Sequence, residues 1–110
     1  MIQVRILRRK DGSIHGFEVK GHANFAKHGE DIVCAGVSAV TVGTVNSLEE
    51  LTGTVMDSRM KDGFLSAYFP VDGEQGTDPR SQLLLESMVV MLNSIAESYG
   101  KYIQIKEVTN

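Results

Sequence analysis

The chain has 110 residues, of which 42% are hydrophobic, and a formal net charge of −3. A chain of this length buries a core without disulfides, so we expect a single domain over residues 1–110. The acidic balance argues against a protein that binds nucleic acid through a broad basic surface, and we expect no direct nucleic-acid binding.

The lone cysteine, Cys34, cannot form an internal disulfide, which favours a reducing compartment. The first ten residues place their charges within and after the apolar positions, the reverse of a signal peptide. The longest apolar run, around 83–92, is interrupted by Glu86 and Ser87 and falls short of the roughly 20 residues that cross a bilayer. We therefore expect a cytoplasmic protein without a membrane partner.

The first predicted elements form a hairpin. Residues 2–9 and 14–20 alternate apolar and polar side chains, as strands do. Between them, Lys10-Asp11-Gly12-Ser13 supplies the Asp and Gly that tight turns favour. The basic cluster Arg8-Arg9-Lys10 is then interpreted as a solvated hairpin end.

A helix is predicted next, from about Cys34 to Leu51, although its valines are β-branched. The length of the segment decides for a helix, and Gly53 lies where that helix would end. Its expected apolar stripe is Val37, Val40, Val45, Leu48 and Leu51.

The second half repeats the order. Strands over 54–60 and 64–70 flank the turn Lys61-Asp62-Gly63, and a helix capped by Asp78 ends near Gly100. A strand over 102–108 closes the chain. The methionines are interpreted as core residues: Met56, Met60, Met88 and Met91. The order ββα-ββα-β predicts an α+β fold with two helices packed on a largely antiparallel sheet.

A long loop over residues 21–33 joins the second strand to the first helix. Loops of this length in so small a protein are usually functional or mobile. His22 lies at the start of the loop and Cys34 directly after it, so the loop can bring the two side chains together. We take them as the candidate catalytic pair.

A thiol at a helix start lies beside unpaired backbone N–H groups and the positive end of the helix dipole, which favour the thiolate. The same N–H groups are candidates to bind an oxyanion, and an imidazole would take the thiol proton and later deliver one to the leaving amine. This combination is typical of acyl transfer. Each residue alone also has an ordinary interpretation: Cys34 as a small buried hydrophobic residue, and His22 as a surface or capping histidine.

Other side chains near Cys34 have open roles. Asp31 either caps the helix, which we favour, or orients His22 or binds the substrate backbone. Ser38 lies one helical turn beyond Cys34, where its hydroxyl supports the thiolate or bonds back to a carbonyl. A zinc site of His22, His28, Asp31 and Cys34 is a weaker alternative because the ligand spacing is wide, and we predict neither a metal nor a cofactor.

The residues Gly21-His22-Ala23, Gly29, Asp31 and Cys34-Ala35-Gly36-Val37-Ser38 together resemble the signature of the ribosomal-processing cysteine proteases, the Prp family. The resemblance covers essentially the whole chain, and its specific part is confined to residues 21–38. It implies that Cys34 is the nucleophile and His22 the general base of a cysteine endopeptidase.

The resemblance also implies a substrate and an assembly. Proteins of this family remove a short N-terminal extension from a large-subunit ribosomal protein, number twenty-seven, during ribosome maturation. They cut after a Phe-Phe pair and before a small residue, and they work as homodimers. Gly21, Ala23 and Gly29 would belong to a substrate loop that orders over an extended peptide.

A substrate with two aromatic residues needs an apolar groove. The candidates are Phe25, Ile32, Val33, Phe64 and Tyr68, each of which is also an ordinary core candidate. A function of another class stays open: a non-catalytic ribosome-associated binding module, motivated by the small size and by Arg8-Arg9-Lys10.

Overall fold

Strands and helices follow one another in the predicted order. The computed structural model describes residues 1–70, 76 and 78–110. Its elements are β1 (Ile2–Arg8), β2 (Ile14–Lys20), α1 (Ile32–Thr52), β3 (Asp57–Lys61), β4 (Phe64–Tyr68), α2 (Pro79–Tyr99) and β5 (Ile103–Thr109).

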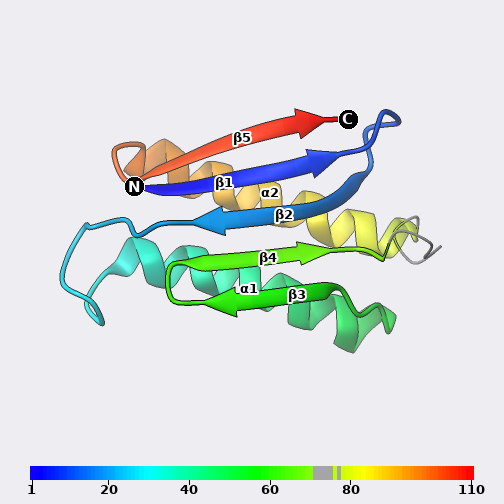
Figure 1. Cartoon of the computed structure of the whole chain (residues 1–110), viewed down its shortest axis with the longest axis horizontal. Coiled ribbons are helices and arrows are strands. Elements are labelled where there is room, and N and C mark those ends of the chain that lie inside the picture. The colour runs from blue at the N-terminus through cyan, green and yellow to red at the C-terminus, as the bar shows by residue number, and fades with distance from the viewer. Residues whose placement is uncertain (71–75, 77) are drawn as a thin grey trace.

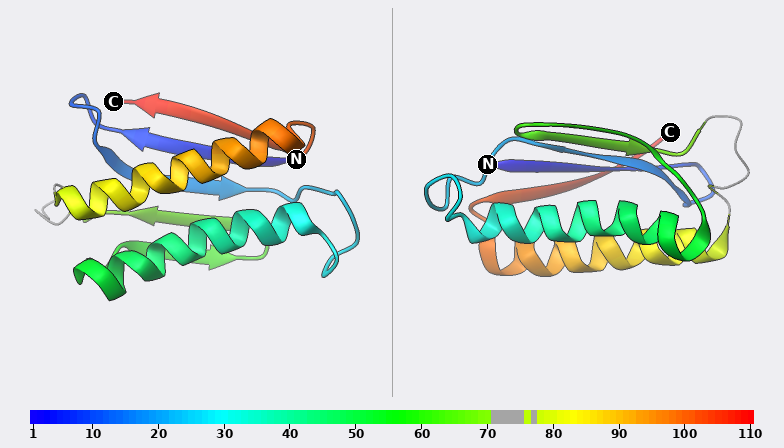
Figure 2. Two further views of the ribbon diagram at one scale, coloured as in Figure 1. Left: turned by 180° about the vertical axis from the view of Figure 1, so that it is seen from behind. Right: turned by 90° about the horizontal axis from the view of Figure 1, so that it is seen from below.

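The strands form one five-stranded sheet in the order β3-β4-β2-β1-β5. Three neighbouring pairs are antiparallel, and β1 and β5 are parallel. Both helices cover the same face of the sheet, as Figures 1 and 2 show. The predicted α+β fold with two helices on a largely antiparallel sheet is confirmed.

The core lies between the sheet and the two helices. In β1, Ile2, Val4 and Ile6 are buried, whereas the alternate residues Gln3 and Arg5 are exposed. Since successive strand residues point to opposite faces, this alternation fixes which face of β1 meets the helices. Each such aliphatic side chain stabilises the fold by about 1.5–3 kcal/mol relative to an exposed one.

Three element boundaries differ from the prediction by two residues or more, and one of them is the end of β4, which is Tyr68 rather than residue 70. The first helix begins at Ile32 rather than at Cys34, because Asp31 caps it and so places Cys34 inside the first turn. The strand predicted over 54–60 begins only at Asp57. Thr54 is buried before it, with its hydroxyl oxygen 3.1 Å from that of Ser81 in α2, so the chain reaches the sheet edge later than the apolar pattern suggests.

Three expected core residues are exposed instead. Leu51 is 65% exposed, Met60 69% and Met91 41%. Leu51 lies in the last turn of α1, and Met60 lies on β3, at the edge of the sheet. Apolar spacing placed them on the right elements, but the sheet and the facing helix do not extend far enough to cover them.

One helix in the described part of the chain, α1, has the length and apolar composition of a membrane span, with a mean hydropathy of 1.4 over an 18-residue window. This corrects the expectation that residues 83–92 are the longest apolar run. The buried side chains of α1, among them Val37 and Leu48, pack in the core of this fold.

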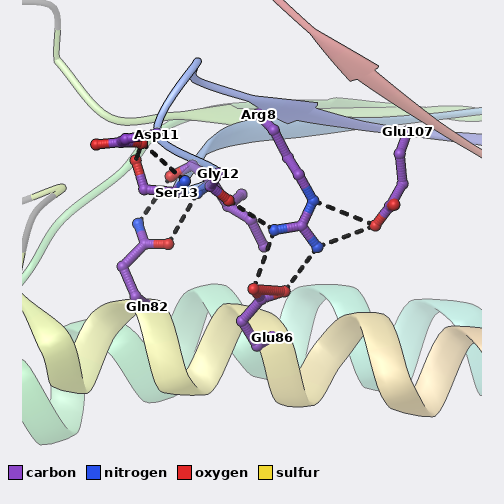
Figure 3. A network of polar contacts seen from close by, with 8 residues as sticks. Arg8, Asp11, Gly12, Ser13, Gln82, Glu86 and Glu107 are labelled. Carbon is purple, nitrogen blue, oxygen red and sulfur yellow. Dashed lines mark hydrogen bonds and ion pairs between the residues drawn. The ribbon is translucent and has the colours of Figure 1, made fainter.

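The basic cluster at the β1–β2 turn is not simply solvated. The guanidinium of Arg8 donates two hydrogen bonds to the carboxylate of Glu86 in α2, at 2.7 and 2.9 Å, and another of 2.9 Å to Glu107 in β5. Figure 3 shows Arg8 between the two carboxylates. Gln82 of α2 bonds both the N–H and the carbonyl of Ile14, so the hairpin is anchored to the helix.

Candidate active site

Asp31 organises both the helix start and the loop before it. One carboxylate oxygen accepts the N–H groups of Val33 and Cys34, each at 3.0 Å, which is the predicted N-cap. The other oxygen accepts from the N–H of Phe25 at 2.9 Å and, more weakly, from Ala26 at 3.4 Å. The structure thus brings the carboxylate to backbone N–H groups rather than to His22.

The electrostatics of Asp31 follow from these bonds. Burial alone would raise the pKa of its carboxyl, but the four N–H donors outweigh burial and hold the pKa below its ordinary value. The residue is therefore a permanent anion at neutral pH. It ties the loop and the first turn of α1 to a single side chain.

Cys34 is half-buried in the first turn of α1, and its sulfur accepts the N–H of Ala23 at 3.3 Å. The positive end of the helix dipole and this N–H both stabilise negative charge on the sulfur. The contact also joins the thiol to the residue that follows His22. The start and the end of the segment 22–34 are therefore in contact.

His22 and Cys34 both line two cavities. The inner cavity, of about 120 Å³, lies between α1 and the β3–β4 hairpin, and the loop cavity, of about 260 Å³, is bounded by the loop that follows β2. The inner cavity is lined by Ile2, Val19, Gly21, His22, Cys34, Val37, Ser38, Thr41, Val42, Met60, Lys61, Gly63, Phe64 and Leu65. The loop cavity is lined by His22, Asn24, Ala26, His28, Gly29, Asp31 and Cys34.

The N–H groups expected to bind an oxyanion are already occupied. Those of Val33 and Cys34 bond the side chain of Asp31, and that of Ala35 bonds its carbonyl. The prediction that the helix start supplies oxyanion donors therefore does not hold for these three N–H groups. The N–H of Ala23 lies beside the same thiol and donates to its sulfur.

The remaining candidate residues occupy distinct places. Ser38 lines the inner cavity beside Cys34, and Gly21 lines the same cavity with a φ of 93°. Gly29, with a φ of 89°, lines the loop cavity, where an added side chain would meet no atom within 4 Å. Ala23 is buried, so the loop is rooted in the core directly after His22.

The groove candidates separate into different environments. Phe64 lines the inner cavity, Val33 is buried in the core, and Ile32 is 55% exposed. Phe25 packs edge-on against two tyrosines, one at the end of α2 and one in the turn just before β5. Tyr68 bonds Glu18 at 2.7 Å, and burial, together with this bond, raises the pKa of its hydroxyl to about 12.

The sequence reasoning missed most of the apolar wall. Thr41 and Val42 line the inner cavity from the same helix as Cys34, and Met60 lines it from β3, far from Cys34 in the sequence. Only the spacing of Ser38, Thr41 and Val42 along one side of α1 carried a local signal for it. Met60 contributes from an edge strand, and nothing local could have shown that.

A zinc site is not favoured by this geometry. Across residues 1–70, 76 and 78–110, no three His, Cys, Asp or Glu side chains come together as metal ligands. His22, His28, Asp31 and Cys34 all border the loop cavity, but the carboxylate of Asp31 is committed to four N–H groups.

Known proteins share this sequence and fold. The profile of the family described as Cysteine protease Prp matches residues 1–104. The ribosomal processing cysteine protease Prp of Bacillus subtilis is 40% identical over 107 residues, which cover 96% of each chain. The fold also matches a crystal structure of the essential ribosomal processing protease Prp from S. aureus, in complex with a covalently linked product peptide. The TM-score is 0.90 at 33% sequence identity, and the match covers 98% of this chain and 100% of that one. A second structure from S. aureus, with a substrate peptide, has a TM-score of 0.85 at 32% identity, over 98% of this chain and 100% of that one.

The family profile and the named relatives define the class of protein: a cysteine protease, which is a hydrolase. The match over nearly the whole chain is more specific. The chain belongs to the cysteine protease Prp family.

Proposed function

We propose that this protein is a cysteine endopeptidase that removes the N-terminal extension of a large-subunit ribosomal protein, number twenty-seven, with Cys34 as nucleophile and His22 as general base. The observation that carries the proposal is the shared lining of both cavities by these two side chains, with the Ala23 N–H on the sulfur. Relatives of similar length are named for ribosomal processing, and one holds a covalently linked product peptide.

The chemistry proceeds in two steps. His22 takes the proton of the Cys34 thiol, and the sulfur attacks the carbonyl carbon of the scissile bond. The Ala23 N–H lies beside the sulfur, where the carbonyl oxygen becomes negative. The imidazolium then protonates the leaving amine, which leaves a thioester on Cys34, and water activated by His22 hydrolyses it.

The inner cavity is the site for a substrate side chain next to the scissile bond. Phe64, Val42 and Met60 give it apolar walls, and it opens beside the thiol. Such a cavity suits an apolar side chain, in agreement with an aromatic residue before the cut. Ser38 borders both the thiol and this cavity, so we assign it a supporting role there.

The cell compartment and the assembly are part of the same proposal. Cys34 is a free thiol, which a reducing cytoplasm preserves. A homodimer is supported by a groove of about 320 Å³ between the two helices, on the side away from the sheet, to which Val40, Leu84 and Met91 contribute. A second copy of the chain would cover that groove.

The decisive experiment is mass spectrometry of a synthetic peptide with a Phe-Phe-Ala junction, incubated with wild-type protein or with Cys34→Ala. We expect cleavage at that junction by the wild type alone, with a rate at least about 10³-fold above the variant. A peptide from the same extension with its junction changed to Gly-Gly-Ala is the specificity control. Equal rates for the two proteins, or no cleavage by a folded wild type, would overturn the proposal.

A further inference from the structure

The turn between β3 and β4 lies directly against the candidate base. A Cβ atom added to Gly63 would stand 2.7 Å from Nε2 of His22 and 3.3 Å from both Cδ2 and Cε1. Carbon atoms in ordinary contact are about 3.5–4.0 Å apart. The imidazole therefore rests on the bare backbone of Gly63, in space that any other residue would fill.

The same turn is tied to the chain just before His22. The N–H of Gly21 donates to the carbonyl of Gly63 at 2.8 Å, one step beyond the last ladder pair, Lys20 with Phe64. The residue before the imidazole and the residue beneath it are thus fixed to each other. Figure 1 shows the turn, the end of β2 and the start of α1 at one end of the sheet.

Asp62, the other residue of this turn, faces the imidazole. Its carboxylate oxygen lies 3.9 Å from Nε2 of His22, and both side chains are substantially exposed. At this separation the contact is an electrostatic one, favourable when the ring carries a proton and weakened by salt. The ring carries that proton after it has deprotonated the thiol.

A comparison of the two Lys-Asp-Gly turns supports a special role for the second. In the β1–β2 turn, Ser13 follows the glycine, and its N–H and hydroxyl both bond the carboxylate of Asp11. In the β3–β4 turn the corresponding position is Phe64, which has no hydroxyl. Within residues 1–70, 76 and 78–110, the Asp62 carboxylate instead lies beside the imidazole of His22.

We infer that the β3–β4 turn positions the catalytic base: Gly63 provides the surface on which the His22 imidazole lies, and Asp62 faces the charge that the ring acquires. Both are positioning residues that act through His22. The inference rests on the proposed function, since it assigns the turn a role only if His22 activates Cys34.

The first test measures the reactivity of the Cys34 thiol rather than the peptidase activity. Iodoacetamide alkylates the thiolate of Cys34 and is small enough to need no substrate groove. The alkylation rate near neutral pH is compared for wild type, His22→Ala, Gly63→Ala and Gly12→Ala. Gly12 is the matched control because it also has a positive φ, 90° against 70° for Gly63, in the same kind of turn, but an added Cβ there meets nothing within 4 Å.

We expect Gly63→Ala to slow both alkylation and peptide cleavage by about 10- to 100-fold, because the ring must move by roughly 1 Å. Gly12→Ala, which carries only the backbone strain, should react like the wild type. Equal alkylation rates for Gly63→Ala and Gly12→Ala would overturn the inference about the turn. His22→Ala tests the proposed dyad separately. If His22→Ala alkylates like the wild type, it is the proposed function that fails.

A second variant decides the matter if Gly63→Ala does not fold. Asp62→Asn removes the charge at an exposed position, with Asp57→Asn at the other end of β3 as its control. We expect Asp62→Asn to slow peptide cleavage about two- to fivefold at low salt, with the difference shrinking in high salt. Identical rates for Asp62→Asn and Asp57→Asn at low salt would contradict the role of the turn.

Discussion

At the scale of single residues, the side chain of Asp31 stabilises both the start of α1 and the loop before it. Its two carboxylate oxygens divide their work: one caps α1, and the other holds the loop at Phe25 and Ala26. An asparagine has one acceptor oxygen, so it can replace one of these functions and not both. The position of the thiol in the first turn and the path of the loop thus depend on a single residue.

Asp31→Asn should therefore lower peptide cleavage by roughly tenfold, because the loop and Cys34 lose their common anchor. The variant should also melt at a lower temperature than the wild type. Asp78→Asn is the control: Asp78 caps α2 and accepts the N–H of Arg80, on the helix that does not carry Cys34. Cleavage assays and thermal unfolding of both variants check this. Full activity in Asp31→Asn would mean that the loop does not need its anchor.

At the scale of elements, the β1–β2 hairpin, α2 and β5 are joined by Arg8. Its guanidinium reaches Glu86 and Glu107, which lie 78 and 99 residues away in the sequence. The hydrogen bonds from Arg8 hold the pKa of Glu86 below its ordinary value of 4.5, although partial burial acts in the opposite direction. The Glu86 side chain is about half-exposed, so the Arg8–Glu86 ion pair contributes only modestly to the free energy of unfolding.

Glu86→Gln should lower the free energy of unfolding by about 1 kcal/mol at neutral pH, after discounting for exposure. Because the folded-state pKa of Glu86 is depressed, this contribution is fully present above pH 4.5 and is lost as the pH falls through the lower folded value. Urea unfolding of wild type and variant should thus give curves that converge in acid. Glu97→Gln, at an exposed position of the same helix, should change little at any pH. A wild-type advantage that persisted in strong acid would contradict the assignment.

At the scale of the whole molecule, the layer of two helices has one face on the sheet and one face free. The free face includes the groove between α1 and α2 and exposed apolar residues of α2: Leu83, Val90 and Met91. Apolar groups gathered in this way are a common sign of a protein–protein contact. The proposed homodimer would remove them from water.

Met91→Glu should consequently shift the protein from dimer toward monomer, since a buried carboxylate without a partner opposes association. Sedimentation at several protein concentrations measures the change. Val55→Glu is the control: Val55 is 56% exposed and lies between α1 and β3, outside the groove. A wild type that sediments as a monomer throughout would remove the homodimer from the proposal.

The sequence by itself determined the order of elements, the two tight turns, the cap at Asp31 and the pairing of Cys34 with His22 as candidates. These features are local: they depend on the alternation of side chains, on turn chemistry and on spacings within about 20 residues. The tertiary structure alone decided the parallel pairing of β1 with β5, the partners of Arg8 and the place of Gly63 under His22. The physical reason is that contacts between distant segments depend on the strand order of the sheet. Local sequence patterns carry no information about that order.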